Sequence, residues 1–106
     1  MERVMVVFVT APRGKGAEIA RRIVEKRLAA CVNVVSGVKS VYWWQGRIED
    51  SEEDLLVLKT SESRIDELIS FIKSIHPYEV PEVIAFPVEK GLGEYLAWVL
   101  NETRQG

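Results

Sequence analysis

The segment RVMVVFVT, residues 3–10, is an unbroken run dominated by β-branched and apolar residues. Such a run is typical of a central strand that is covered on both faces. The following residues 11–14, APRG, end it, because proline and glycine interrupt regular strands. After them Ala17, Ala20, Ile23 and Leu28 recur at helical spacing, which predicts a helix over residues 16–29. The chain therefore opens with a buried strand and an amphipathic helix.

The next part of the sequence predicts a long hairpin. Residues 31–44 are rich in β-branched and aromatic side chains, Gly37 permits a bend or bulge, and Gln45-Gly46 offers a turn. Residues 47–59 then form the return strand. The acidic residues 49–54 interrupt its apolar pattern, and we interpret them as a solvated bulge.

A second helix, a last strand and a closing helix complete the pattern. Ser63 and Asp66 have the spacing of a capping box, which predicts a helix start, and Pro77 disfavours helical geometry at His76, so the helix should end there. Residues 83–88 read as a strand, and Pro87 within it favours a position at the sheet edge. Residues 94–104 again show helical spacing.

The order strand, helix, strand, strand, helix, strand, followed by one helix, is that of a ferredoxin-like split βαβ fold. We therefore predict an α+β protein with an antiparallel sheet and one domain over residues 1–106. With right-handed crossovers, the first and third strands lie in the centre and the second and fourth at the edges.

The amino-acid composition limits the classes of partner that the protein can bind. The 14 Lys and Arg residues against 16 Asp and Glu residues leave a net charge of −2, with no basic patch for nucleic acid or a membrane surface. The single cysteine, Cys31, excludes an intramolecular disulfide. The apolar run over residues 4–9 is too short for a signal-peptide core, so we expect a soluble, cytoplasmic protein.

The aromatic residues Tyr42, Trp43 and Trp44 indicate self-association. Neighbouring strand residues point to opposite faces, so all three cannot enter the core of one monomer. Two helices on one face also leave the other face of the sheet uncovered, and the closing helix is too short to cover all of it. Exposed apolar faces and sheet edges invite pairing between chains, so we expect a closed homo-oligomer with edge-to-edge pairing.

The segment HPYEVPE, residues 76–82, begins with the only histidine and contains two prolines, Pro77 and Pro81. It can be a stiff connector, or a rigid platform for binding. His76, Glu79 and Glu82 are possible ligands of a divalent metal ion, and the thiolate of Cys31 would favour copper or zinc. In the expected topology Cys31 and His76 lie far apart within one subunit, so a joint site would have to cross a subunit boundary. Alternatively, Cys31 is a small buried apolar residue.

The sequence contains no complete phosphate-binding or catalytic motif. Residues 12–16, PRGKG, lack the first glycine and the final hydroxyl residue of a phosphate-binding loop, which favours a polar loop that opens a helix. Cys31 has an apolar setting with no reason for activation, and no triad is visible, so we expect a protein that is not an enzyme. Lys59 can pair with a carboxylate or an anionic ligand, or reach into solvent.

Five motifs in order and at matching spacing closely resemble the CutA divalent-cation tolerance proteins. They are RLAACVN (27–33), SVYWWQG (40–46), LKT (58–60), HPYEVPE (76–82) and YLAW (95–98). The resemblance implies a ferredoxin-like homotrimer similar to the PII signalling proteins, a cytoplasmic location, and a role in tolerance to copper and other divalent ions. It also implies a metal site at Cys31 and His76, to which we add Glu79 and Glu82 as nearby carboxylates. The loop at residues 12–16 departs from the acidic helix start expected for the family.

Two function classes follow, together with a simpler alternative. In the first, a trimer binds Cu²⁺ or another divalent ion between subunits, with no organic cofactor. In the second, a PII-like sensor binds a small molecule or nucleotide in a cleft formed by Trp43, Trp44, Lys59 and Tyr78. In the alternative, the trimer is a structural scaffold.

Overall fold

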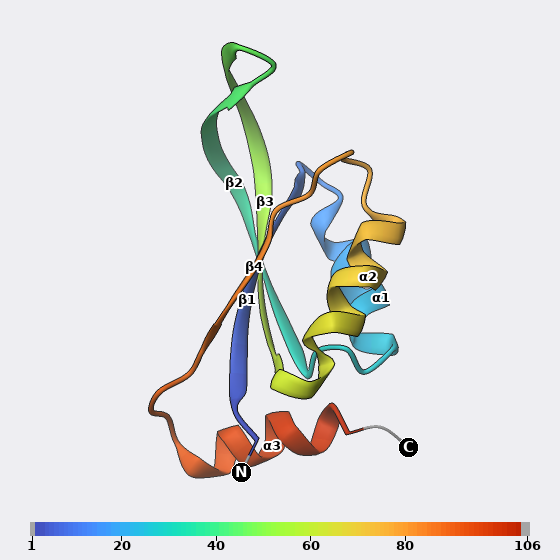
Figure 1. Cartoon of the computed structure of the whole chain (residues 1–106), viewed down its shortest axis with the longest axis vertical. Helices are drawn as coiled ribbons and strands as arrows, with labels where there is room; N and C mark the ends of the chain where they lie inside the picture. The colour runs from blue at the N-terminus through green and yellow to red at the C-terminus, as the bar shows by residue number, and fades with distance from the viewer. Residues whose placement is uncertain (1, 105–106) are drawn as a thin grey trace.

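The computed structural model describes residues 2–104 and contains one four-stranded sheet and three α-helices (Figure 1). One 3₁₀ turn, Glu62–Arg64, precedes the second helix. Residues 1, 105 and 106 of the predicted domain lie outside this description. The elements are β1 (Val4–Pro12), α1 (Gly16–Glu25), β2 (Cys31–Trp44), β3 (Arg47–Ser61), α2 (Ile65–Ile75), β4 (Val83–Pro87) and α3 (Gly93–Glu102).

The sheet has the predicted topology. The strand order is β2-β3-β1-β4, so β1 and β3 are central and β2 and β4 are the edges. Every neighbouring pair is antiparallel. Residues 4–10 therefore belong to the interior of the sheet, as their unbroken apolar pattern indicates. This confirms the α+β, ferredoxin-like prediction.

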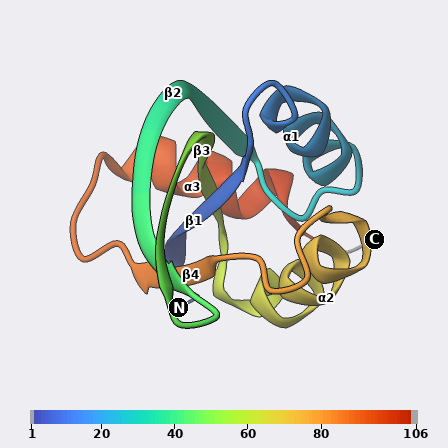
Figure 2. The same cartoon turned by 90° about the horizontal axis from the view of Figure 1, so that it is seen from above.

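Both α1 and α2 cover the same face of the sheet (Figures 1 and 2). Val7 and Val9 of β1 point to this face together with Leu56 and Leu58 of β3, and all four are fully buried. They pack against apolar side chains of the two helices, which include Ile23, Leu68 and Ile72. Burial of each such side chain stabilises the fold by about 1.5–3 kcal/mol, so this layer is the core.

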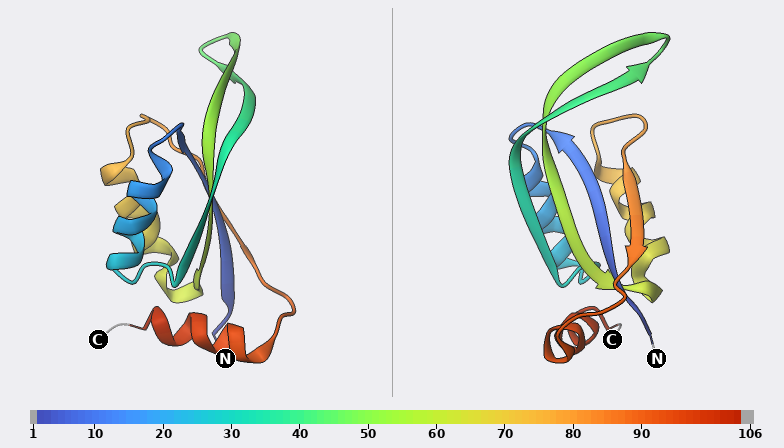
Figure 3. Two further views of the ribbon diagram at one scale, coloured as in Figure 1. Left: turned by 180° about the vertical axis from the view of Figure 1, so that it is seen from behind. Right: turned by 90° about the vertical axis from the view of Figure 1, so that its left-hand side faces the viewer.

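The other face of the sheet, here called the open face, has no helix among the described residues over most of its length, and α3 crosses only one end (Figure 3). By strand alternation it carries the apolar side chains of Val6, Phe8, Val35, Leu55, Val57, Ile84 and Phe86. Of these, Ile84 is 54% and Val35 is 46% exposed. The prediction of an uncovered apolar face is confirmed for the single chain.

The far halves of β2 and β3 form an arm that projects beyond the other strands (Figure 3). Tyr42, Trp43 and Trp44 lie on this arm, and Trp43 is 72% exposed. None of the three aromatic side chains enters the core, in agreement with the alternation argument.

Helix α1 is shorter than predicted. It ends at Glu25 instead of residue 29, because Arg27 adopts a left-handed conformation with φ of 57°. The Arg27 amide bonds to the Val24 carbonyl and the Leu28 amide bonds to the Ile23 carbonyl, which is a Schellman end. Glycine normally occupies the left-handed position of such an end. Because Arg27 stands there in this chain, the sequence contains no signal that the helix ends at Glu25.

The interpretation of residues 49–54 as a solvated bulge was wrong. They continue β3 without a break, and the register shift lies on β2 between Val35 and Val38, where Gly37 has φ of 76° as predicted. Two of these acidic side chains, Glu53 and Asp54, are 6% and 3% exposed. The burial has a reason: the Asp54 carboxylate accepts hydrogen bonds from two backbone amides at the start of α1.

Those two bonds run from Gly14 N–H (3.0 Å) and Gly16 N–H (2.9 Å) to Oδ2 of Asp54. The amides of the loop at residues 12–16 are therefore held by the protein's own carboxylate, which agrees with the reading of this segment as a loop that opens a helix.

The capping box predicted at Ser63 and Asp66 does not form. Within residues 2–104, no side chain caps α2 through its N-cap residue, which is Arg64. The Ser63 amide instead donates to Glu2 Oε2 at 2.7 Å. In the same range of residues, no helix combines the length and the apolar character needed to span a membrane.

Candidate functional site

The segment HPYEVPE connects α2 to β4 and lies beside the end of β1. His76 ends α2 with an extended backbone and is buried, with 8% of its surface exposed. Its Nε2 lies 2.7 Å from the Thr10 carbonyl oxygen, and its Nδ1 accepts the Tyr78 backbone N–H at 3.0 Å. Because a carbonyl oxygen only accepts, Nε2 carries the proton. Both ring nitrogens are therefore occupied.

The position of Thr10 explains the first of these bonds. The ladder between β1 and β4 ends at the pair Val9 and Val83, so Thr10 lies one residue beyond it. The His76 ring takes the place that a further β4 residue would occupy. A buried carbonyl without a partner is unfavourable, so this bond stabilises the end of the sheet.

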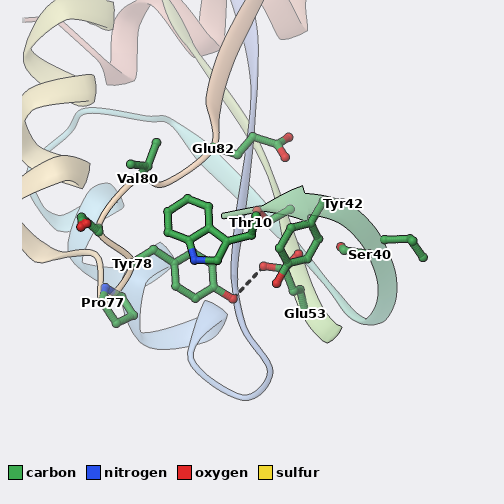
Figure 4. Close-up of a pocket in the computed structure, with 11 residues that line it drawn as sticks. Thr10, Ser40, Tyr42, Glu53, Pro77, Tyr78, Val80 and Glu82 are labelled. Atoms are coloured by element: carbon green, nitrogen blue, oxygen red, sulfur yellow. Dashed lines mark hydrogen bonds between the residues drawn. The ribbon is translucent and has the colours of Figure 1, made fainter. Parts of the chain in front are cut away.

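Tyr78 links the segment to β3. Its hydroxyl donates to Oε2 of Glu53 at 2.7 Å, and its ring lies 4.8 Å from the His76 ring, measured between centroids. Figure 4 shows the Tyr78 hydroxyl directed at Glu53, with Tyr42 on the other side of that carboxylate. Burial raises the pKa of Tyr78 well above its usual value, and the hydrogen bond to the Glu53 carboxylate raises it further.

These contacts form one wall of a cleft of about 680 Å³ between the arm and the HPYEVPE segment (Figure 4). Its lining residues are Thr10, Ser40, Val41, Tyr42, Trp44, Glu53, Pro77, Tyr78, Glu79, Val80 and Glu82. The volume is within the usual range of small-molecule sites, which is about 300–1,000 Å³.

Two of the four residues predicted for a small-molecule cleft are in this lining. Trp44 and Tyr78 line it, whereas Trp43 and Lys59 do not. Trp43 precedes Trp44 on a strand, so its side chain points to the opposite face. Lys59 lies at the other end of the sheet, beside Cys31 on the neighbouring strand.

Cys31 belongs to a separate group. It is half-buried, its Sγ lies 3.9 Å from Oδ1 of Asn33, and Lys59 Nζ also donates to that oxygen. Burial raises the pKa of the Tyr95 hydroxyl, with the nearby Cys31 thiol as a further cause. Within the single chain, Lys59 therefore pairs with a side-chain amide and not with a carboxylate.

The predicted metal ligands do not converge within one chain. Cys31 begins edge strand β2, whereas His76 contacts β1 near the start of the opposite edge strand, β4. Glu79 and Glu82 are exposed, and their carboxylates have no hydrogen-bond partner among the described residues. Across residues 2–104, no three His, Cys, Asp or Glu side chains could hold one metal ion together.

Sequence reasoning missed several residues of the cleft, above all Glu53 and Thr10. Glu53 stood in the acidic stretch that we took to be solvated, and its contact with Tyr78 spans 25 residues. The predicted return strand already included Glu53, but no local pattern identifies Tyr78 as its partner, because Tyr78 lies on a distant segment.

Comparisons with known proteins agree with the resemblance. The sequence profile of the CutA1 divalent ion tolerance protein family matches residues 5–102. A curated relative from Thermus thermophilus, "Divalent-cation tolerance protein CutA", is 44% identical over 92% of this chain and 96% of its own length. A relative from Oryza sativa, "Protein CutA 1, chloroplastic", is 47% identical over 95% of this chain. This chain spans only 58% of that rice protein.

The fold agrees as well. The crystal structure of CutA1 from Oryza sativa superposes with a TM-score of 0.94 at 46% identity, and the match covers 98% of this chain and 96% of that one. The sequence profile, the relatives and the solved structure point to one family across nearly the whole chain. The chain therefore belongs to the CutA1 divalent ion tolerance protein family.

Proposed function

We propose that the protein acts in tolerance to divalent cations as a cytoplasmic homotrimer that binds Cu²⁺ or another divalent ion at sites shared between subunits. We propose a binding protein, not an enzyme. The observation that supports this best is the position of the candidate donors. They lie at or near the two unpaired edges of the sheet and do not converge within one chain. A complete donor set therefore requires a second subunit.

The surface of the chain supports the oligomer. Edge strands β2 and β4 have unpaired backbone groups on their outer sides, and such edges pair readily with other chains. The open face between them is apolar, with Ile84 and Phe86 exposed by 54% and 42%. A closed ring of three chains would pair the edges and cover this face.

Among the four proposed ligands, Cys31, Glu79 and Glu82 have accessible donor atoms. His76 differs, because a metal ion binds the lone pair of a ring nitrogen and both nitrogens already make hydrogen bonds. For His76 to bind a metal ion, the bond to Tyr78 or the bond to Thr10 must break. The most direct role of His76 is to hold Glu79 and Glu82 in place.

The test is a Cu²⁺ titration against a competing chelator, with the oligomeric state measured in the same samples. It compares the wild type with Cys31→Ser and Glu82→Gln, and with Glu89→Gln as a matched exposed control outside the site. We expect a fixed ratio of copper to subunit in the wild type. Each ligand variant should bind about tenfold more weakly or worse while remaining oligomeric, and the control should be unchanged.

Binding of equal strength in all four proteins, or binding without a fixed ratio, would overturn the proposal. His76→Ala is a less specific variant here, since it also removes two structural hydrogen bonds. Loss of binding in that variant alone would show only that the segment must stay in place.

The cleft supports a second candidate, a sensor that binds a small molecule. Its volume of about 680 Å³ is far larger than a metal ion requires, and Trp44 and Tyr78 line it as predicted for this alternative. Stabilisation against heat by a small molecule, unaffected by chelator, would support this candidate.

A further inference from the structure

The described side chains that line the cleft carry negative charge and no positive charge. Three carboxylates line it, from Glu53, Glu79 and Glu82, together with three aromatic side chains. None of the described residues in the lining is Lys, Arg or His. The nearby Lys73 donates its Nζ proton to the backbone oxygen of Glu79 and not to a carboxylate. The cleft is therefore acidic and partly aromatic.

The carboxylates are spread around the cleft and do not meet at one point. Among residues 2–104, no group of three acidic, histidine or cysteine side chains is close enough to coordinate one ion. A metal ion needs its oxygen ligands within about 2.0–2.6 Å. The cleft within one chain is thus better suited to a small molecule of several atoms than to a bare metal ion.

The aromatic side chains add a second, independent property. Tyr42 and Tyr78 lie on either side of the Glu53 carboxylate (Figure 4). Trp44, on the same face of β2 as Tyr42, contributes an indole to the lining. Aromatic faces attract organic cations, and a desolvated carboxylate beside them strengthens that attraction. Glu53 is only 6% exposed, so its charge is poorly screened by water.

We infer that this cleft binds organic ammonium ions with an apolar body, with the ammonium group at Glu53 between the two tyrosines and the apolar body against Trp44. The same charge disfavours the phosphates of a nucleotide, so the cleft in this chain differs from the nucleotide alternative. The inference rests on the second candidate function, because it names the ligand class of that site. The residues that it assigns to the ligand, which are Glu53, Tyr42, Tyr78 and Trp44, are not among the proposed copper ligands.

The test uses three probes with one carbon skeleton: 4-phenylbutylamine (cation), 4-phenylbutanol (neutral) and 4-phenylbutyrate (anion). Each is titrated into the intact oligomer at neutral pH by calorimetry, with and without EDTA. We expect the amine to bind about tenfold more tightly than the alcohol, the butyrate to bind most weakly, and EDTA to have no effect.

Matched variants locate the site. Trp44→Leu should weaken amine binding about tenfold, whereas Trp43→Leu, on the opposite face of the same strand, should leave it unchanged. Glu53→Gln should remove the preference for the amine over the alcohol, whereas Glu52→Gln, which loses only an exposed ion pair with Arg13, should keep it. If Glu53→Gln does not fold, the exposed Glu82→Gln serves instead, with a smaller loss of preference expected.

The outcomes separate the two proposals. Equal binding of amine and alcohol, or tighter binding of the butyrate, would overturn the inference and leave the small-molecule candidate standing. No binding of any probe by the wild type, as expected if a neighbouring subunit fills the cleft, would overturn both. Equal losses in Trp43→Leu and Trp44→Leu would also contradict the proposed position.

Discussion

At the scale of single residues, His76 shows how a chemically suggestive side chain can have a structural role. The only histidine of the chain opens a segment that contains two prolines, Pro77 and Pro81, which suggests a binding residue. In the structure its ring joins the Thr10 carbonyl to the Tyr78 amide and so fastens the connector to the sheet. The prolines and the imidazole together hold the carboxylates of Glu79 and Glu82 at the mouth of the cleft.

Tyr78 allows a prediction about stability and pH. Tyr78→Phe leaves the buried Glu53 carboxylate without this donor, so we expect a loss of about 1–3 kcal/mol at pH 7. The folded state raises the pKa of Tyr78, so its stabilising contribution is complete below about pH 10, the unfolded value, and declines as pH rises above it. Wild-type stability should therefore fall more steeply above pH 10 than that of the variant.

Urea unfolding at fixed protein concentration, from pH 7 to pH 11, measures both effects. Tyr95 contributes equally to the two proteins and so does not alter the comparison. Identical slopes above pH 10 would mean that Tyr78 does not keep its proton in the folded state for the reason given.

At the scale of elements, the start of α1 depends on a strand far away in the sequence. Asp54 of β3 accepts the amides of Gly14 and Gly16 and so replaces the side-chain cap that α1 lacks. The close approach needs a glycine, because a Cβ at position 16 would lie 2.8 Å from both Cβ and Oδ2 of Asp54. The acidic strand and the glycine-containing loop thus form one unit.

The chain offers a matched pair of variants for this contact. Gly16 and Gly93 are each the first residue of a helix, but a Cβ at Gly93 would meet nothing within 4 Å. Gly16→Ala should destabilise the protein by about 1–3 kcal/mol through this overlap. Gly93→Ala should change stability by less than about 1 kcal/mol, with a slight gain expected. Thermal unfolding of both variants measures the difference, and equal effects would contradict the role of Asp54.

At the scale of the whole molecule, one face of the sheet is covered by α1 and α2 and the other is largely bare (Figure 1). The apolar side chains of the open face and the projecting arm would be unusual on a protein that acts as a monomer. Both the proposed trimer and the proposed metal sites depend on how this surface is covered.

Substitution on the open face tests the assembly. Ile84→Asp places a charge on the apolar face, on edge strand β4, and burying it in an interface would cost several kcal/mol, so we expect the oligomer to dissociate. Val24→Asp is the control, since Val24 is also exposed, at 39%, but lies on α1 over the covered face. Sedimentation equilibrium gives the mass of each. A trimeric Ile84→Asp protein, or dissociation in both variants, would contradict an interface on the open face.

Much of this protein was determined by its sequence alone. The order of the elements, the central position of β1 and β3, the bulge at Gly37 and the exposure of Trp43 all follow from local patterns of apolar residues, glycine and proline. Such patterns are readable because burial acts on each residue separately, and its period reports whether a residue lies on a helix or a strand face. The motif HPYEVPE was singled out by its histidine and its prolines, and five of its residues line the cleft.

Only the tertiary structure decided the partners within that site. The contacts of His76 with Thr10, Tyr78 with Glu53 and Gly16 with Asp54 join residues 66, 25 and 38 positions apart. Periodicity indicates the face on which a side chain lies, but not which atom of a distant element comes within 3 Å of it. That depends on strand register and on where each ladder ends. For this reason the observed cleft includes Glu53, which was not predicted, and excludes Trp43 and Lys59, which were.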